Sequence, residues 1–358
     1  MRFYRDRMMV VLFLLAVVAQ IIIIIPGQVV YGFEENSFVL QVKNKLENKK
    51  EQIKVSYQMD FDDVDIDRLN ILVKKAVSSL DDYNQFNVKG WQIEIAGNNK
   101  NVDITIDVNY YSNAQQDRFL FKKIDEIINE ITDPYMGTHK KIKNITDYIA
   151  ANVRYDNSKQ RYSAYDALIN GESTCQGYAL LTYLMLNQVD VENKIIRGNM
   201  DDQKHAWNLV KVNGNWYHLD LTQISSHFQK YGQLIYNEYM VSDRALSLKY
   251  IWNQGEYPQA VSSYFSQLKQ EIKYTEGKLY DRFINELNLF YLEDKYTVGS
   301  NEELKDKTID LLQDNKNIVE LRLTDSTLTQ SDISNVIMET INENNNLSNI
   351  YKEHSCNQ

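Results

Sequence analysis

Apolar and polar residues alternate in two different periods over the first third of the chain. Helical spacing of apolar residues covers 37–48 and 64–80, whereas strand-like alternation covers 52–58, 88–96 and 102–110. Asn98-Asn99 separates the last two strand patterns and indicates a hairpin. We therefore predict an N-terminal α+β domain over residues 33–115.

Helical spacing returns over 119–131 and 139–153, with Asp133-Pro134 ending the first of these helices. A third, strongly apolar helix is predicted to start near Cys175, and strand patterns follow over 204–212 and 215–221. Near the C-terminus the pattern predicts a helix over 302–314, a strand over 318–323 and a helix over 332–342. These elements indicate a core domain over residues 116–260 and a C-terminal α/β region with a disordered tail over 261–358.

The first 32 residues have a different character. Arg2, Arg5 and Arg7 precede an apolar run over 8–25 that Pro26-Gly27 ends. This pattern is typical of a signal peptide or an N-terminal membrane anchor. We expect an exported protein, extracellular or associated with the cell envelope, that touches the membrane only through this segment.

Composition narrows the possible partners and ligands. The chain of 358 residues carries 39 Lys and Arg against 49 Asp and Glu, a net charge of −10. Nucleic-acid backbones are bound by concentrated basic surfaces, so we expect no nucleic-acid partner. The two cysteines, Cys175 and Cys356, are far apart in the sequence and neither has the spacing of a metal site or a structural disulfide.

Cys175 falls in the first turn of a predicted helix, with Ser173 or Thr174 able to serve as the N-cap. The positive end of the helix dipole favours a thiolate there, and the first-turn amides can stabilise an oxyanion. Gly177 allows close approach of another backbone or of a substrate. The alternative is that Cys175 is a small buried apolar residue, the usual fate of a free cysteine.

The two strands after Cys175 predict a histidine–carboxylate pair. A two-residue turn at Asn213-Gly214 sets Val212 opposite Asn215, and this register puts His205 and Asp220 on one face as diagonal neighbours, about 7 Å apart. His218 lies on the same face as Asp220. Spacing alone therefore leaves His205 and His218 as equal candidates for a base.

Three segments, IKNITDYIAANVRYD, STCQGYA and KHAWNLVKVNGNWYHLDLT, resemble the bacterial transglutaminase-like superfamily over about residues 116–224. The resemblance implies an α+β, papain-like core in which the helix that carries the cysteine packs on an antiparallel sheet. It also implies Cys175 as nucleophile, His205 as base and Asp220 as the acid that orients the base. His218 is then expected to have a packing role, and no cofactor or metal is expected.

The resemblance implies a thiol acyltransferase that acts on glutaminyl or peptide acyl groups of a protein or peptide substrate through a thioester. A cysteine peptidase or amidase of the same fold is the alternative within enzymes. A binding or assembly module of the envelope, with an unreactive thiol, is the alternative outside enzymes.

Overall fold

A computed structural model of the chain describes residues 31–232, 234, 236–247, 249–264, 267–268, 297–313, 321–323 and 330–343. The chain divides into two compact units, Met1–Gln116 and Asp117–Gln358. Most of the predicted leader (residues 1–30) and the predicted disordered tail (residues 344–358) lie outside the described residues. Within the described part of the chain, no helix combines the length and apolar character needed to cross a membrane.

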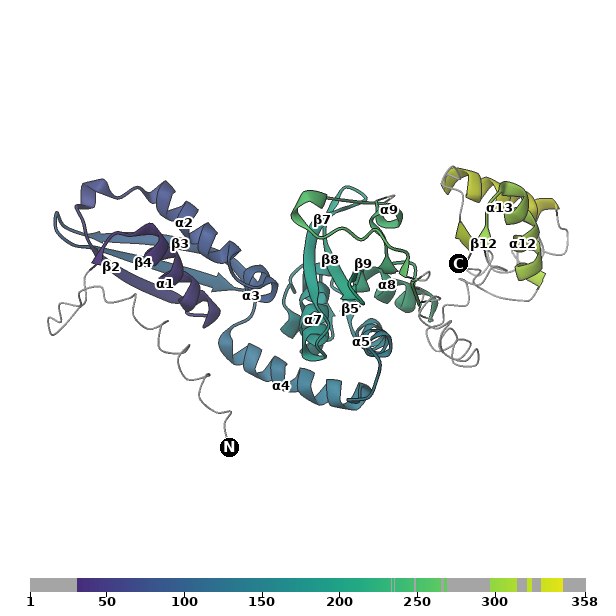
Figure 1. Cartoon of the computed structure of the whole chain (residues 1–358), viewed down its shortest axis with the longest axis horizontal. Helices are drawn as coiled ribbons and strands as arrows, with labels where there is room; N and C mark the ends of the chain where they lie inside the picture. The colour runs from purple at the N-terminus through teal and green to yellow at the C-terminus, as the bar shows by residue number, and fades with distance from the viewer. Residues whose placement is uncertain are drawn as a thin grey trace, which may run out of the picture. The chain divides into compact units, whose positions relative to one another are not determined.

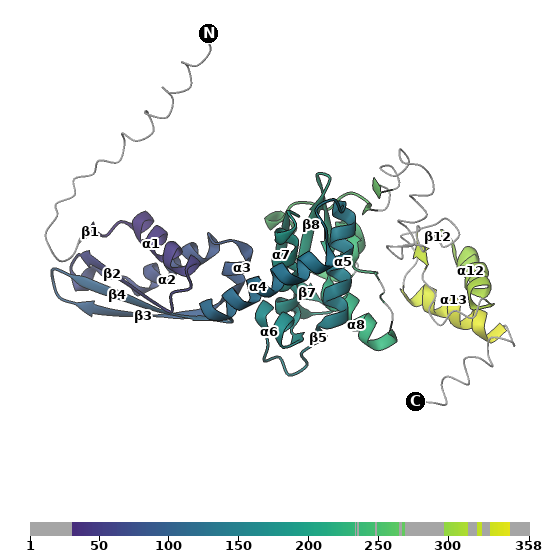
Figure 2. The ribbon, with the colours of Figure 1, turned by 90° about the horizontal axis from the view of Figure 1, so that it is seen from below.

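The N-terminal unit is a four-stranded sheet in the order β1-β2-β4-β3 with two long helices on one face (Figures 1 and 2). Phe38, Val42 and Leu46 pack on the inward residues of the central strands, including Ile53 and Ile104. The predicted helices and strands are confirmed, whereas three short elements, β1, a 3-10 helix over Phe61–Asp63 and α3, were not predicted. The elements are β1 (Tyr31–Gly32), α1 (Glu35–Glu47), β2 (Gln52–Gln58), α2 (Ile66–Ser78), α3 (Asp82–Asn87), β3 (Val88–Gly97) and β4 (Val102–Tyr110).

The second unit contains a five-stranded antiparallel sheet in the order β10-β9-β8-β7-β11. Helix α7 is buried along most of its length and packs against β8, where the Asn208 amide donates to the carbonyl of Ala179 at 3.0 Å. The fold is therefore mixed α+β, with the cysteine-bearing helix on an antiparallel sheet, as predicted. Its elements are α4 (Ala114–Ile131), α5 (Thr138–Asn152), β5 (Arg154–Tyr155), α6 (Ala164–Ile169), β6 (Glu172–Ser173), α7 (Cys175–Gln188), β7 (Asn193–Met200), β8 (Gln203–Val212), β9 (Asn215–Leu219), α8 (Leu221–Tyr231), β10 (Tyr239–Val241), α9 (Asp243–Leu246) and β11 (Tyr250–Trp252).

The predicted hairpin between β8 and β9 is confirmed. Val212 pairs with Asn215 and the same register continues to the end of β9. Asn213 and Gly214 both have positive φ, 49° and 82°, as a two-residue hairpin turn of the primed type requires.

The predicted length of the second strand is wrong. We expected a strand over 215–221, but β9 ends at Leu219 and α8 begins at Leu221. The physical reason is Asp220, whose side chain accepts hydrogen bonds from the backbone N–H groups of Thr222 and Gln223 and so caps the helix.

The C-terminal region contains helix α12 (Asn301–Gln313), a parallel pair formed by β12 (Thr297–Val298) and β13 (Arg322–Leu323), and helix α13 (Gln330–Glu343). These elements confirm the predicted order of helix, strand and helix.

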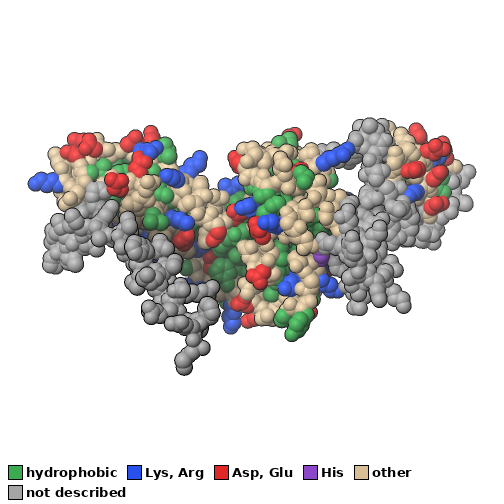
Figure 3. All heavy atoms as spheres, in the orientation of Figure 1, with side chains coloured by type: hydrophobic (Ala, Val, Ile, Leu, Met, Phe, Trp, Pro, Cys, Tyr) green, Lys and Arg blue, Asp and Glu red, His purple; other side chains and the backbone are tan. Residues whose placement is uncertain are grey.

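Charged side chains of both signs are present on the face of the molecule drawn in Figure 3. On this face, Lys and Arg side chains lie scattered among acidic and neutral ones.

Candidate active site

Cys175 is the first residue of α7 and is partly exposed. Thr174 occupies the N-cap position, but no side chain caps the helix and its first turn holds no acidic residue. The Ser173 hydroxyl, the other predicted cap, donates instead to the carbonyl of Arg161 at 3.0 Å. Because neither a capping side chain nor a carboxylate competes there, the N-terminal dipole of α7 acts directly on the thiol.

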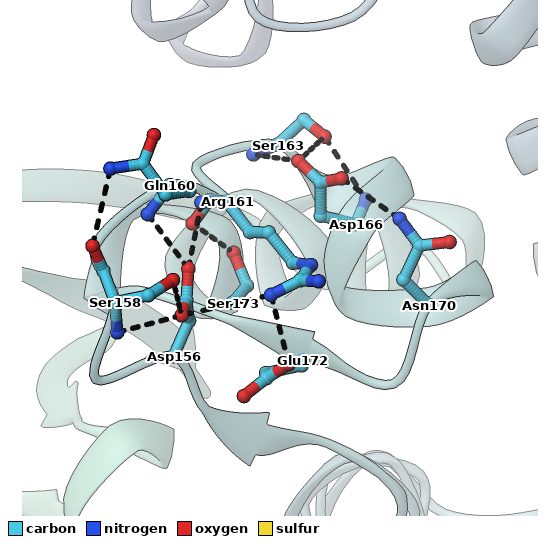
Figure 4. A network of polar contacts seen from close by, with 9 residues as sticks. All are labelled: Asp156, Ser158, Gln160, Arg161, Ser163, Asp166, Asn170, Glu172 and Ser173. Carbon is cyan, nitrogen blue, oxygen red and sulfur yellow. Dashed lines mark hydrogen bonds and ion pairs between the residues drawn. The ribbon is translucent and has the colours of Figure 1, made fainter.

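A loop organised by Asp156 supports the entry to α7 (Figure 4). The Asp156 carboxylate is buried and accepts hydrogen bonds from the backbone N–H groups of Ser158, Gln160 and Arg161. Hydrogen bonds lower the pKa of Asp156 to about 2, and the bond from the Ser158 hydroxyl has the largest effect. The carboxylate is therefore ionised throughout the physiological range and holds the loop in one conformation.

This loop is bonded to the residues just before the cysteine. The carbonyl of Arg161 accepts from the backbone N–H of Thr174 at 2.9 Å as well as from Ser173. Gly177 faces this contact, since a Cβ atom at that position would lie 1.9 Å from Oγ of Ser173 and 2.7 Å from the carbonyl oxygen of Ser163. The predicted close approach of another backbone to Gly177 is confirmed.

His205 and Asp220 form a direct pair. Nε2 of His205 lies 2.6 Å from Oδ2 of Asp220, and both side chains are buried. The same Oδ2 accepts from the hydroxyl of Tyr250 at 2.7 Å, while Oδ1 accepts from the N–H of Thr222 at 2.9 Å. Three contacts thus fix the carboxylate, and through it the orientation of the imidazole.

The electrostatics of this pair favour a charged imidazole. Burial by itself lowers the pKa of His205, but the charge and hydrogen bond of Asp220 and a hydrogen bond with Cys175 raise it to about 10. Burial likewise raises the pKa of Asp220, but the His205 charge outweighs it and holds this pKa below its usual range. Since Asp220 engages Nε2, the ring nitrogen that remains for the thiol is Nδ1.

The structure therefore brings Cys175, His205 and Asp220 together, the three residues that the sequence singled out. A thiol beside an imidazole that a carboxylate orients is the arrangement that activates cysteine for attack on acyl groups. The catalytic roles themselves stay a prediction.

His218 is bonded elsewhere. Its Nδ1 accepts from the indole N–H of Trp207 at 3.0 Å and its Nε2 lies 2.7 Å from Oδ1 of Asp243. The side chain is only 1% exposed, and burial lowers the pKa of His218 although Asp243 opposes this. Both ring nitrogens are thus engaged away from Asp220, which resolves the ambiguity that spacing left open.

Sequence reasoning missed three residues around the predicted site. Nothing in the sequence placed Tyr250 near Asp220. Tyr250 lies on β11, which pairs with β7 and not with the β8–β9 hairpin whose register could be predicted. Burial, followed by the charge of Asp220, raises the pKa of Glu238 to about 7, and the carbonyl of Glu238 accepts from the Asp220 N–H at 3.0 Å. Burial and then the charge of Cys175 raise the pKa of Tyr155, which lies in the recognisable VRYD segment and pairs with Ser173.

The chemistry available here is that of a thiol. In the part of the chain that the structure describes, no group of three or more His, Cys, Asp or Glu side chains is arranged to hold a metal ion.

Comparison with known proteins gives one family match. Residues 123–221 match the model of the transglutaminase-like superfamily. No curated protein matches the chain.

Solved structures give weaker similarities. A proposed cysteine protease from Cytophaga hutchinsonii is 16% identical with a TM-score of 0.26, over 37% of this chain and 62% of that one. A TGase is 13% identical with a TM-score of 0.28, over 54% of this chain and 58% of that one. A proposed protease from Parabacteroides distasonis is 13% identical with a TM-score of 0.25, over 37% and 36%. The chain thus spans less than two thirds of the length of each of these structures.

Proposed function

We propose that the protein is a thiol acyltransferase of the transglutaminase-like superfamily, whose model residues 123–221 match. It would act on glutaminyl or peptide acyl groups through a thioester at Cys175. The observation that carries the proposal is the buried pair of His205 and Asp220, joined at 2.6 Å, with Cys175 near enough to raise the pKa of His205. An imidazole with a raised pKa beside a helix N-terminus stabilises a thiolate.

In the first half of the reaction, Sγ of Cys175 attacks the carbonyl carbon of the acyl donor. The C–N bond of the donor then breaks, and His205 gives its proton to the departing ammonia or amine. The products are a thioester on Cys175 and a neutral imidazole. The uncapped amides in the first turn of α7 are suited to stabilise the negative charge that develops on the carbonyl oxygen.

In the second half, a primary amine attacks the thioester carbonyl. The neutral imidazole of His205 takes a proton from the amine, the C–S bond breaks and the thiolate of Cys175 is regenerated. Asp220 keeps the imidazole in the tautomer that this step needs, because its carboxylate accepts from Nε2. Water in place of the amine would give hydrolysis, the reaction of a peptidase or amidase.

We also propose that the apolar run over 8–25 exports the protein. The basic residues before this run support an orientation in which the N-terminus stays in the cytoplasm and the rest of the chain is exported. Fractionation of cells that express the full chain checks this: a protein found only in the cytoplasm would contradict export.

The test of the reaction is incorporation of a labelled primary amine into a glutamine-containing protein by the full chain. Cys175→Ala should abolish incorporation, whereas Cys356→Ala, which removes the other thiol of the chain, should leave it unchanged. Mass spectrometry of the acceptor protein separates amine transfer from cleavage. Hydrolysed products without incorporated amine would identify a peptidase or amidase, and incorporation that survives Cys175→Ala would refute the thioester mechanism.

A further inference from the structure

The second unit contains a second buried histidine–carboxylate pair that the proposed reaction does not use. His218, on β9, and Asp243, the first residue of α9, are joined at 2.7 Å. Asp243 is held in turn by Ala260, whose N–H donates to Oδ2 at 2.9 Å and whose carbonyl accepts from the Asp243 N–H at 2.8 Å. The carboxylate therefore has a fixed position from which to orient His218.

The hydrogen bonds define the tautomer of His218. The indole of Trp207 can only donate, so Nδ1 of His218 must be the acceptor of that bond at 3.0 Å. Nε2 therefore carries the proton and donates it to Asp243. A doubly protonated ring would set an N–H against the indole N–H, so the contact with Trp207 requires a neutral His218.

Trp207 links this pair to the predicted base. Its ring is stacked on that of His205, with centroids 5.9 Å apart and an angle of 20° between the planes. Both residues lie on β8 two positions apart, so their side chains share one face. An indole face is the aromatic surface that attracts a cation most strongly. In this position it stabilises the imidazolium form of His205.

The packing around Trp207 leaves its indole ring little freedom to move. The indole is 1% exposed and lies against Gly198, where a Cβ atom would come within 2.7 Å of Cη2 of the indole. Tyr250 and Trp252 meet the same ring edge-on, with centroids at 5.2 Å and 5.9 Å. These contacts restrict the tilt of the ring, while the bond from its N–H to His218 fixes the rotation in its own plane.

We propose that His218 and Asp243 are positioning residues, which lock Trp207 against His205 and so stabilise the imidazolium that pairs with the thiolate of Cys175. This inference rests on the proposed thiol chemistry. It extends that chemistry by a chain of contacts that holds the His205 imidazole in place. The chain runs from Ala260 through Asp243, His218 and Trp207.

A merely structural pair would stabilise the fold without changing the reactivity of the thiol. The two roles are separated by the rate at which iodoacetamide alkylates Cys175 as a function of pH, because only the thiolate reacts. The full chain with Cys356→Ala is the background, so that one thiol is followed. Alkylation needs no acyl substrate, so this test stands even if the protein transfers no acyl group.

His218→Leu removes both hydrogen bonds, whereas the side-chain amide of His218→Gln can accept from the indole and donate to the carboxylate. At about pH 6 we expect His218→Leu to slow alkylation by about tenfold, the size of a partly desolvated cation–π contact. His218→Gln should restore most of the rate. Ile145→Ala, a cavity variant in the buried face of α5, controls for loss of stability and should leave the pH profile unchanged.

Trp207→Phe keeps an aromatic ring but removes the N–H that His218 accepts, and it serves if His218→Leu does not fold. It should lower the alkylation rate at pH 6, and adding His218→Gln to it should cause no further loss. The positioning role is overturned if His218→Leu, or Trp207→Phe in its place, lowers the melting temperature but keeps the wild-type alkylation profile. It is also overturned if leucine and glutamine at position 218 behave alike.

Discussion

Replacement of Asp220 by asparagine is the most informative single change in this protein. Each of the two oxygens of the Asp220 carboxylate has its own function. Oδ1 caps α8 through the N–H of Thr222 at 2.9 Å, and Oδ2 accepts from His205 at 2.6 Å and from Tyr250 at 2.7 Å. Asparagine keeps an oxygen for the cap, so α8 should persist.

With that oxygen in the cap, the new NH2 group faces Nε2 of His205. The NH2 group can only donate, so Nε2 must accept and the proton of a neutral imidazole moves to Nδ1. Nδ1 then cannot take a proton from the thiol. The loss of the Asp220 charge also removes the largest effect that raises the pKa of His205, so this pKa should fall from about 10.

The expected cost in turnover is large. The same replacement in a serine-protease triad, where the tautomer also reverses, costs about 10⁴-fold. We expect a loss of about 10³- to 10⁴-fold for Asp220→Asn, or about 4–5.5 kcal/mol in the activation free energy. The assays are amine incorporation and the pH dependence of Cys175 alkylation.

Asp65→Asn is the matched control, because Asp65 also caps a helix through its side chain but lies in the N-terminal unit. It should leave turnover unchanged. The reasoning is refuted if Asp220→Asn retains more than about a tenth of wild-type turnover, a loss below about 1.4 kcal/mol, or if NMR titration finds the pKa of His205 unchanged.

Three further predictions follow from the same contacts. Gly177→Ala should destabilise the fold by about 1–3 kcal/mol, since its Cβ would meet Oγ of Ser173 at 1.9 Å. Gly90→Ala, whose Cβ would meet nothing within 4 Å, should change the melting temperature little, and equal effects of the two changes would contradict this. The pKa of His205 is about 10 in the folded protein against an ordinary 6.5. The stabilisation that its charged form provides is therefore complete below about pH 6.5 and is lost towards pH 10. Unfolding midpoints should fall over that range, and an equally large fall in His205→Gln would count against this prediction. Tyr250→Phe should cost about 1.5–3 kcal/mol of stability by removing a hydrogen bond to a charged group, measured by denaturant unfolding, and an unchanged midpoint would show that the bond contributes nothing.

Much of the N-terminal unit and the core of the predicted site could be read from local pattern. The start of α7 at Cys175 follows from the change from polar to apolar residues, and the register of the β8–β9 hairpin follows from Asn213-Gly214. Such features involve residues close in the sequence, where spacing and turn chemistry fix the geometry. The alternating pattern made the predicted strand too long at Asp220, because such a pattern does not reveal that an aspartate will cap a helix.

The choice between His205 and His218 is different in kind. In the predicted hairpin both histidines share a face with Asp220, so no local rule separates them. Tertiary structure decides between them, because Asp243 engages Nε2 of His218 from outside the hairpin while Tyr250 donates to Asp220 beside His205. The sequence by itself thus determined that Asp220 and one of two histidines would accompany Cys175. Which imidazole is charged, and what holds it, depends on partners brought in by chain segments that the hairpin does not contain.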